Sequence, residues 1–303
     1  MRIIFMGTPD FAVASLDILV QNNYNIVGVI TAPDRKAGRG RQISESAVKK
    51  YAVEHGLNIL QPTNLKNEEF LTELANLKAD LQIVVAFRML PEVVWNMPPK
   101  GTFNLHASLL PQYRGAAPIN WAIINGETET GVTTFFIDHK IDTGDLLFQE
   151  KVAIQPTENA GHLHDKLMTV GAALVLKTVV AIESDDTHPI SQKQVVDIKH
   201  APKIFKEDCL INWTDSTTNI FNKIRGLSPY PAAFTYLDDK VLKVYEVSFQ
   251  HTIHNFTAGH LESDDKTYIR FYTNDGYIDL LELQLEGKKR MAVEDFLRGY
   301  SIE

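Results

Sequence analysis

Three polar residues, an amide, an imidazole and a carboxylate, are the strongest candidates for chemistry in this sequence. Asn104 and His106 stand two positions apart in an otherwise apolar run, and Asp142 follows in the turn-like run Ile-Asp-Thr-Gly-Asp. Residues two apart in a β-strand share a face, so Asn104 and His106 should project together while Leu105 packs behind. We expect the glycine at position 144 to permit an exposed Asp142 carboxylate.

These residue types suit the transfer of an acyl group to an amine. The oxygen of the tetrahedral intermediate needs preorganised donors, and protons must leave the attacking nitrogen and reach the leaving one. Asn104 is the candidate oxyanion and positioning group, His106 can donate to the oxyanion or titrate, and Asp142 can orient or charge His106 and relay protons. An amine attacks the carbonyl carbon directly, so the scheme requires no metal and no nucleophilic serine or cysteine. Spacing alone remains a weak signal, because a lone strand histidine or turn aspartate is more often structural.

The first half of the chain alternates short β-branched runs with amphipathic helical patterns. Strands are expected at residues 2–6, 26–31, 81–86 and 102–106, and helices at 11–21, 44–55 and 68–77. This alternation predicts a doubly wound, mostly parallel, Rossmann-like α/β sheet, whose ligands bind at the carboxyl ends of the strands. Residues 132–137 and 146–152 look like an added hairpin, and a helix is expected over 162–182.

The pattern changes after this first half. Residues 184–206 show no sustained period and carry two prolines. A helix at 216–225 and strands at 233–237, 241–249, 256–261, 268–271 and 276–285 then predict a small β-barrel of the OB type. We therefore expect a catalytic domain over 1–188, a linker over 189–206 and an OB-like domain over 207–303.

Composition narrows the class of protein. The 303 residues are 44% apolar with a net charge of −8 and a single cysteine, Cys209, which rules out an internal disulfide and a cysteine metal cage. The amino terminus reads as a core strand without the features of a signal peptide, and apolar runs are too short to span a bilayer. We expect a cytoplasmic protein. Residues 201–303 hold 12 Lys and Arg against 16 Asp and Glu, so binding to nucleic acid has to rest on local patches.

The motifs around the candidate residues resemble the formyltransferase family that uses 10-formyltetrahydrofolate. The similarity rests on Asn-Leu-His at 104–106, Ser-Leu-Leu-Pro at 108–111, Arg-Gly-Ala-Ala-Pro at 114–118 and the turn at 141–145. It implies that Asn104, His106 and Asp142 are catalytic. It also implies folate contacts through Ser108, Leu109, Leu110 and Pro111, and through the loop residues Phe87, Arg88 and Leu90. Many relatives have Tyr-Gly where this chain has Phe87 and Arg88.

A basic loop points to the formyl acceptor. Arg35, Lys36, Arg39 and Arg41 place four cations within seven residues, interleaved with glycines. The loop resembles the Pro-Asp-Arg-x-Ala-Gly-Arg-Gly loop of methionyl-tRNA formyltransferases, which enters the acceptor stem. Glycines let such a loop bend to RNA, and arginines bind phosphates bidentately or stack on an end base.

The carboxyl-terminal part also resembles the second domain of these tRNA enzymes. We take Trp213 and Phe296 as core residues. A basic group is a further candidate for phosphate contact; it comprises Lys240, Lys243, Lys288, Lys289 and Arg290.

The resemblance implies formyl transfer from 10-formyltetrahydrofolate, as a co-substrate and without a metal, to the free amino group of initiator methionyl-tRNA. The product would be formylmethionyl-tRNA for translation initiation. Expected partners are the initiator tRNA and the folate but no membrane, and a monomer is expected. Two alternatives stay open. One is a formyltransferase acting on an amino-sugar nucleotide, and the other is a non-catalytic, folate-responsive RNA-binding protein.

Overall fold

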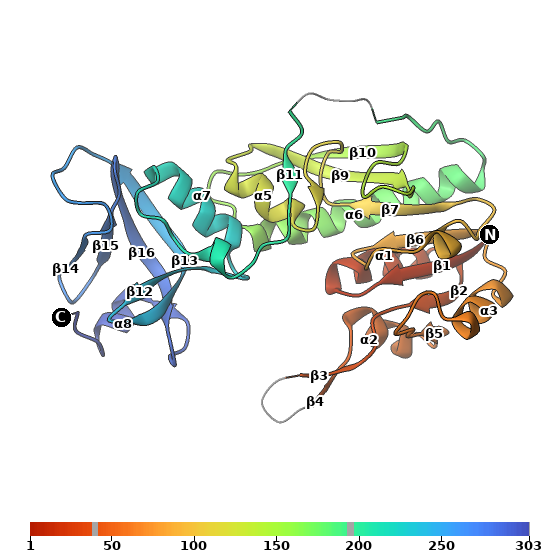
Figure 1. Cartoon of the computed structure of the whole chain (residues 1–303), viewed down its shortest axis with the longest axis horizontal. Helices are drawn as coiled ribbons and strands as arrows, with labels where there is room; N and C mark the ends of the chain where they lie inside the picture. Colours follow the sequence, from red (N-terminus) through yellow and green to blue (C-terminus); the bar gives the residue numbers. More distant parts are fainter. Residues whose placement is uncertain (38–41, 193–196, 303) are drawn as a thin grey trace. The chain divides into compact units, whose positions relative to one another are not determined.

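The computed structural model describes residues 1–37, 42–192 and 197–302, and the chain divides into two compact units (Figure 1). The first unit comprises Met1–Gly115, Gly131–Val152 and His164–Lys199. The second comprises Ala116–Thr130, Ala153–Leu163 and His200–Glu303. Both units are thus assembled from separated stretches of sequence. The domain boundaries expected near 188 and 207 stay predictions.

The first unit is built on a seven-stranded sheet in the order β10-β9-β7-β6-β1-β2-β5. Five strands run parallel, and β9 joins β7 antiparallel. This arrangement confirms the predicted doubly wound, mostly parallel sheet. The strands are β1 (Arg2–Gly7), β2 (Asn25–Ile30), β5 (Ile59–Leu60), β6 (Leu81–Val85), β7 (Thr102–His106), β9 (Glu129–Phe136) and β10 (Leu146–Ala153).

The central strand β1 is covered on both faces. Ile3, Ile4, Phe5 and Met6 are all fully buried, so neither set of alternating side chains meets solvent. A strand buried on both faces reads as a continuous apolar run, which is the pattern of a sheet sandwiched between helices. Ile4 and Met6 pack in a core cluster that also contains Phe70, Leu74 and Val94. The helices over the sheet are α1 (Asp10–Gln21), α2 (Ala47–Glu54), α3 (Glu68–Asn76) and α4 (Glu92–Trp95).

Helix starts in the first unit follow from side-chain caps. The Ser46 hydroxyl accepts the backbone N–H of Lys49 at 3.0 Å, and the Asn67 side chain accepts that of Phe70 at 3.0 Å. Such caps satisfy amide groups that the first helical turn leaves unpaired. Helix α2 therefore begins after Ser46 and not at 44 as expected, because residue 44 ends a short hairpin. That hairpin consists of β3 (Arg35–Ala37) and β4 (Gln42–Ser44).

The remaining helices are α5 (Pro118–Ile124), α6 (Ala160–Glu183) and, near the carboxyl end, α7 (Thr217–Leu227) and α8 (Val293–Leu297). Helix α6 passes very close to β7: a Cβ atom built on Gly171 would lie 2.8 Å from Leu105. In the described part of the chain, every helix is too short or too polar to serve as a membrane span.

The second unit holds a curled, six-stranded antiparallel sheet, which confirms the small barrel-like fold expected for the carboxyl-terminal part. Its main path runs β12-β13-β16-β15-β14, and β17 pairs with β16. The strands are β12 (Ala233–Leu237), β13 (Lys240–His251), β14 (Leu261–Ser263), β15 (Ile269–Tyr272), β16 (Gly276–Leu285) and β17 (Met291–Ala292).

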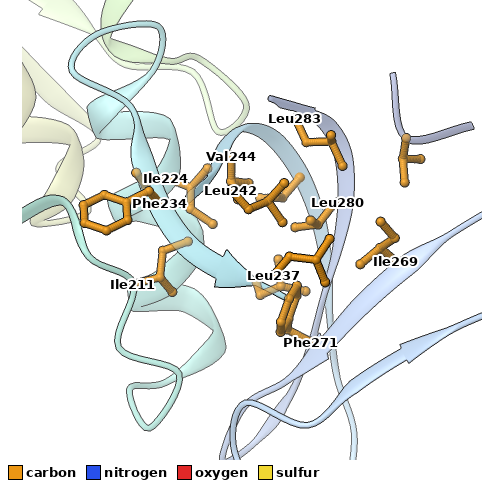
Figure 2. Packing of buried hydrophobic residues seen from close by; sticks show 14 of the residues in the cluster. Ile211, Ile224, Phe234, Leu237, Leu242, Val244, Ile269, Phe271, Leu280 and Leu283 are labelled. Atoms are coloured by element: carbon orange, nitrogen blue, oxygen red, sulfur yellow. The ribbon is translucent and has the colours of Figure 1, made fainter. Parts of the chain in front are cut away.

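A single apolar cluster fills the curl of this sheet. Figure 2 shows Leu237, Leu242, Phe271 and Leu280 gathered from four strands, and all four are at most 4% exposed. Ile224 of α7 belongs to the same cluster. As predicted, Phe296 is core, at 3% exposure, while Trp213 packs at the edge with its ring stacked 4.4 Å from that of Phe271.

The expected strand over 256–261 is wrong for most of its length, since strand pairing starts only at Leu261. Gly259 has a φ of 86°, a left-handed conformation that interrupts an extended strand. The Phe256 ring stacks instead on His260, with ring centroids 4.6 Å apart. The segment is therefore an aromatic loop.

Candidate active site

Asn104 and His106 lie within the last three residues of β7. The register pairs Asn104 with Val84 of β6 on one side and with Phe135 of β9 on the other. Both β6 and β7 end at the same edge of the sheet because they run parallel. This is the carboxyl edge, where open α/β sheets bind ligands. Leu105 points the other way, toward α6, as the alternation predicts.

His106 is held by one hydrogen bond to the backbone. Its side chain is 7% exposed, and its Nε2 atom lies 2.9 Å from the carbonyl oxygen of Tyr113. A carbonyl oxygen can only accept, so Nε2 must carry a proton in this arrangement. The nitrogen left to gain or lose a proton is therefore Nδ1.

Asp142 faces that nitrogen. Its Oδ2 atom lies 3.9 Å from Nδ1 of His106 and accepts the backbone N–H of Gly115 at 3.0 Å. The expectation of an exposed carboxylate is wrong, because the Asp142 side chain is only 13% exposed. Asp142 itself takes the left-handed backbone, with a φ of 55°. Gly144 has a different role: a Cβ atom there would lie 1.7 Å from the carbonyl oxygen of Phe136, so only glycine fits.

The Asn104 side chain is half-buried, and no hydrogen bond joins it to another residue in the described ranges. A side-chain amide at a sheet edge that makes no hydrogen bond within the protein can donate one to an incoming carbonyl oxygen. The structure thus brings together the three candidate catalytic residues in the first unit. Their catalytic roles stay predictions.

The expected folate segment over 108–111 is largely bonded to its own protein. Thr133 Oγ1 donates to the Ser108 carbonyl at 2.6 Å and accepts the N–H of Leu110 at 3.1 Å, and Gln149 Nε2 donates to the Leu110 carbonyl at 2.8 Å. Ser108 is fully buried, and its hydroxyl donates to the Gln112 carbonyl. These polar groups are turned toward the protein's own donors and acceptors. Leu109 and Pro111 are half-buried, whereas Leu110 is buried.

The second expected folate segment follows β6 at the same sheet edge. Leu90 and Arg88 line an open pocket of about 980 Å³, together with Lys66 and neighbouring residues. Phe87 is half-buried and packs at the edge of the core cluster that contains Leu90. The structure gives Arg88 a structural role: its guanidinium donates to the carbonyl oxygens of Pro62 and Thr63, the latter at 2.9 Å.

The base of the basic loop is fixed on the first unit. The Asp34 carboxylate accepts from Lys49 at 2.5 Å and from Gln61 at 2.9 Å. The bonded Lys49 ammonium holds the pKa of Asp34 below its usual value. Arg35 is exposed at the start of β3. Partial desolvation of Arg88 and the positive charge of Arg35 together lower the pKa of Arg88. Arg35 and Arg88 are therefore close enough for their charges to interact.

The other predicted cations of this loop fall at or beyond the limits of the described chain. Lys36 belongs to β3, and Arg39 and Arg41 lie outside the described residues. Their contact with RNA stays a prediction.

One cation of the basic group in the second unit is already engaged in an ion pair. Lys288 and Lys289 are exposed in the connection between β16 and β17. Arg290 is paired with Glu282, which raises its pKa, and its guanidinium carbon lies 4.2 Å from the centre of the Tyr245 ring. Of the three, the lysines are the more available to a phosphate.

Sequence reasoning missed the backbone partners of the site and one side chain. The Tyr113 carbonyl and the Gly115 N–H act through the main chain, which leaves no signal in residue type. Gln192, from the expected linker, donates to the carbonyl oxygens of Asp142 and Gly144. Among the described residues, no cluster of three or more His, Cys, Asp or Glu side chains is arranged to hold a metal.

Two family models match this chain. Residues 1–179 match the family model described as formyl transferase, and residues 203–301 match that described as formyl transferase, C-terminal domain. These two matches cover most of the chain.

Similar sequences show which formyltransferase family the chain belongs to. The chain is 58% identical over 306 residues to a methionyl-tRNA formyltransferase of Flavobacterium johnsoniae, covering 100% of this chain and 97% of the relative. It is 54% identical over 310 residues to one from Bacteroides thetaiotaomicron, covering 100% and 96% respectively. The chain belongs to the methionyl-tRNA formyltransferase family.

Solved structures share the fold at lower identity. An N-formyltransferase from Helicobacter canadensis, solved with folinic acid and dTDP-3-aminofucose, has a TM-score of 0.71 at 21% identity and covers 92% of this chain and 98% of its own. HypX from Aquifex aeolicus in complex with tetrahydrofolic acid has a TM-score of 0.68 at 18% identity, with coverage of 100% and 48%.

Proposed function

We propose that this chain transfers the formyl group of 10-formyltetrahydrofolate to the amino group of initiator methionyl-tRNA. The observation that carries the proposal is the placement of Asn104, His106 and Asp142 at one sheet edge, in a chain 58% identical to a methionyl-tRNA formyltransferase. The reaction supplies formylmethionyl-tRNA for translation initiation, and we expect it in the cytoplasm. A single chain suffices, because it contributes all three residues.

The reaction begins with attack of the methionyl nitrogen on the formyl carbon. As the carbonyl oxygen gains negative charge, the Asn104 amide donates a hydrogen bond to it. The nitrogen, which becomes positively charged, loses a proton, and the folate nitrogen gains one as its bond to carbon breaks. The products are a formamide on the methionine and tetrahydrofolate, so atoms and charge balance.

His106 and Asp142 serve the proton transfers. Because the Tyr113 carbonyl occupies Nε2–H, the exchangeable site on His106 is Nδ1. The Asp142 carboxylate stands 3.9 Å from that atom and stabilises positive charge that develops there. The distance exceeds a direct hydrogen bond, so protons between the two groups pass through water.

The proposed substrate contacts extend from this edge. Folate binds against the segments at 87–90 and 108–111, of which the first lines the pocket beside Arg88 and Leu90. The tRNA contacts Arg35, Lys36, Arg39 and Arg41, with Lys288, Lys289 and Arg290 as further contacts. The anchored base of the basic loop supports this proposal, because a fixed base limits the entropy lost when the loop binds RNA.

The acceptor can be tested by following the consumption of 10-formyltetrahydrofolate with three acceptors. We expect turnover with initiator methionyl-tRNA, and none with uncharged tRNA or with a dTDP-linked amino sugar. Turnover with the amino sugar alone would favour the first alternative function. No turnover with any acceptor, combined with retained binding of RNA and folate, would favour the non-catalytic alternative.

A further inference from the structure

The side-chain amide of Gln192 has all its hydrogen-bonding groups engaged around the turn that carries Asp142. Its Nε2 atom donates to the carbonyl oxygen of Asp142 at 3.0 Å and to that of Gly144 at 2.8 Å. Its Oε1 atom accepts from the guanidinium of Arg114 at 2.5 Å. The amide therefore uses both of its N–H groups and its oxygen.

These contacts join two segments that meet at the Asp142 carboxylate. Arg114 is followed directly by Gly115, whose backbone N–H donates to Oδ2 of Asp142. Gln192 thus fixes the backbone of the Asp142 turn and, through Arg114, the segment that orients the carboxylate. No hydrogen bond joins Gln192 to His106 or Asn104, so it would act through Asp142.

The turn needs such support because its backbone is strained. Asp142 has a φ of 55°, in the left-handed region where a residue with a side chain is strained relative to ordinary backbone. A conformation of this kind persists only where its surroundings determine it. The two bonds from Gln192 support the turn on one side, and the close packing of Gly144 against Phe136 supports it on the other.

We propose that Gln192 is a positioning residue for formyl transfer, which holds Asp142 at its distance from His106. The proposal rests on the proposed function of the site. Misplacing a catalytic group by about 1 Å can cost on the order of 100-fold in rate. We therefore expect loss of the Gln192 donors to slow the transfer step about 10- to 100-fold.

Gln192→Glu is the sharpest variant. Glutamate keeps the length of the side chain and still accepts from Arg114, but it has no N–H to offer the carbonyl oxygens at neutral pH. Gln192→Met removes donor and acceptor without adding charge and serves if the Glu variant does not fold. Gln21→Ala is the matched control, because Gln21 bonds only within α1, to Asp17.

The measurement is single-turnover formylation of initiator methionyl-tRNA, with melting temperature as a check on folding. We expect the Glu or Met variant to transfer slowly and the control to match wild type. When Asp142→Asn is already present, Gln192→Glu should lower the transfer rate by less than a further factor of two. Wild-type rates in both Gln192 variants, or a loss that multiplies with that of Asp142→Asn, would overturn the positioning role. Absence of transfer by the wild-type chain would instead reject the proposed function.

Discussion

Oδ2 of Asp142 lies 3.9 Å from Nδ1 of His106, while the same oxygen accepts the backbone N–H of Gly115 at 3.0 Å. The carboxylate is thus anchored by the main chain and faces the histidine without bonding to it directly. Since the Tyr113 carbonyl occupies the other ring nitrogen, the histidine presents its exchangeable nitrogen to a negative charge. This arrangement predicts a distinct effect for each substitution at the site.

Removing either strand residue should abolish most of the transfer rate. We expect Asn104→Ala and His106→Ala to lose on the order of 100- to 1000-fold, or about 3–4 kcal/mol of transition-state stabilisation. Both side chains lie at the end of a strand, so circular dichroism should show an intact fold. Asn255→Ala, an exposed amide in the second unit, is the control. Transfer within about threefold of wild type would remove the residue from the mechanism.

Asp142→Asn should change the pH dependence as well as the rate. The amide oxygen can still accept from Gly115, so the shape of the turn is kept while the negative charge and the proton relay are lost. Because the negative charge beside Nδ1 of His106 is lost, the acid limb of the rate profile should flatten or collapse. An unchanged profile with a near-normal rate would mean that the carboxylate is structural.

Arg39→Ala should impair transfer to tRNA and leave folate binding unchanged. If Arg39 holds the end of the acceptor stem open, its loss lowers the catalytic rate, because the methionyl amine no longer reaches Asn104 and His106. Arg39→Lys should rescue only in part, because an ammonium lacks the planar fork of a guanidinium. Kinetics with full-length methionyl-tRNA provide the measurement.

Phosphate contacts by the other loop cations should behave differently. Arg35→Ala should weaken tRNA binding and reduce its salt dependence by about one charge. Lys266→Ala removes the same charge from an exposed turn of the second unit and should change neither quantity.

Wild-type turnover in Arg39→Ala would reject the loop assignment and reopen the amino-sugar alternative.

The stability of the second unit should depend on Asp275 at acid pH. The backbone N–H of Thr217 at 2.8 Å and its hydroxyl at 2.7 Å hold the pKa of Asp275 below its usual value. A lowered pKa contributes stability above the ordinary value, near 4, and that stability is lost as pH falls through the folded value. The side chain is 44% exposed, so screening limits the contribution to about 1 kcal/mol.

Calorimetry of wild type and Asp275→Asn from pH 7 to pH 2 tests this. The variant should melt lower at pH 7, and the two melting curves should converge as the pH approaches 2. Asp239→Asn, in the turn between β12 and β13, is the control. A difference that stays constant across the range would exclude a contribution from ionisation.

Most of the fold could be predicted because local pattern and tertiary structure agree. Strand β7 and its boundaries follow from the apolar run that ends at His106, and β12 and β16 match their predicted limits. The failures arise where local geometry overrides the pattern. Ser46 caps α2 two residues after the predicted start, and Gly259 breaks the strand expected over 256–261.

The candidate site was predictable in residue type but not in its support. Residue pattern and resemblance identified Asn104, His106 and Asp142 as candidates. Burial of the Asp142 carboxylate could not be predicted, because it depends on the N–H of Gly115, a main-chain group 27 residues away. Gln192 was assigned to a linker because its partners are carbonyl oxygens from a turn 50 residues earlier. Hydrogen bonds of this kind leave no periodicity in the sequence.

The most direct measurement is the fate of a labelled formyl group. With 10-formyltetrahydrofolate labelled in the formyl carbon and excess initiator methionyl-tRNA, the label should appear on the methionine amino group in one-to-one yield with tetrahydrofolate. The wild-type chain should achieve this without a second protein, and Asn104→Ala should transfer at least about 100-fold more slowly. Label that stays on the folate, or that reaches a dTDP-linked amino sugar but not the tRNA, would contradict the proposed function.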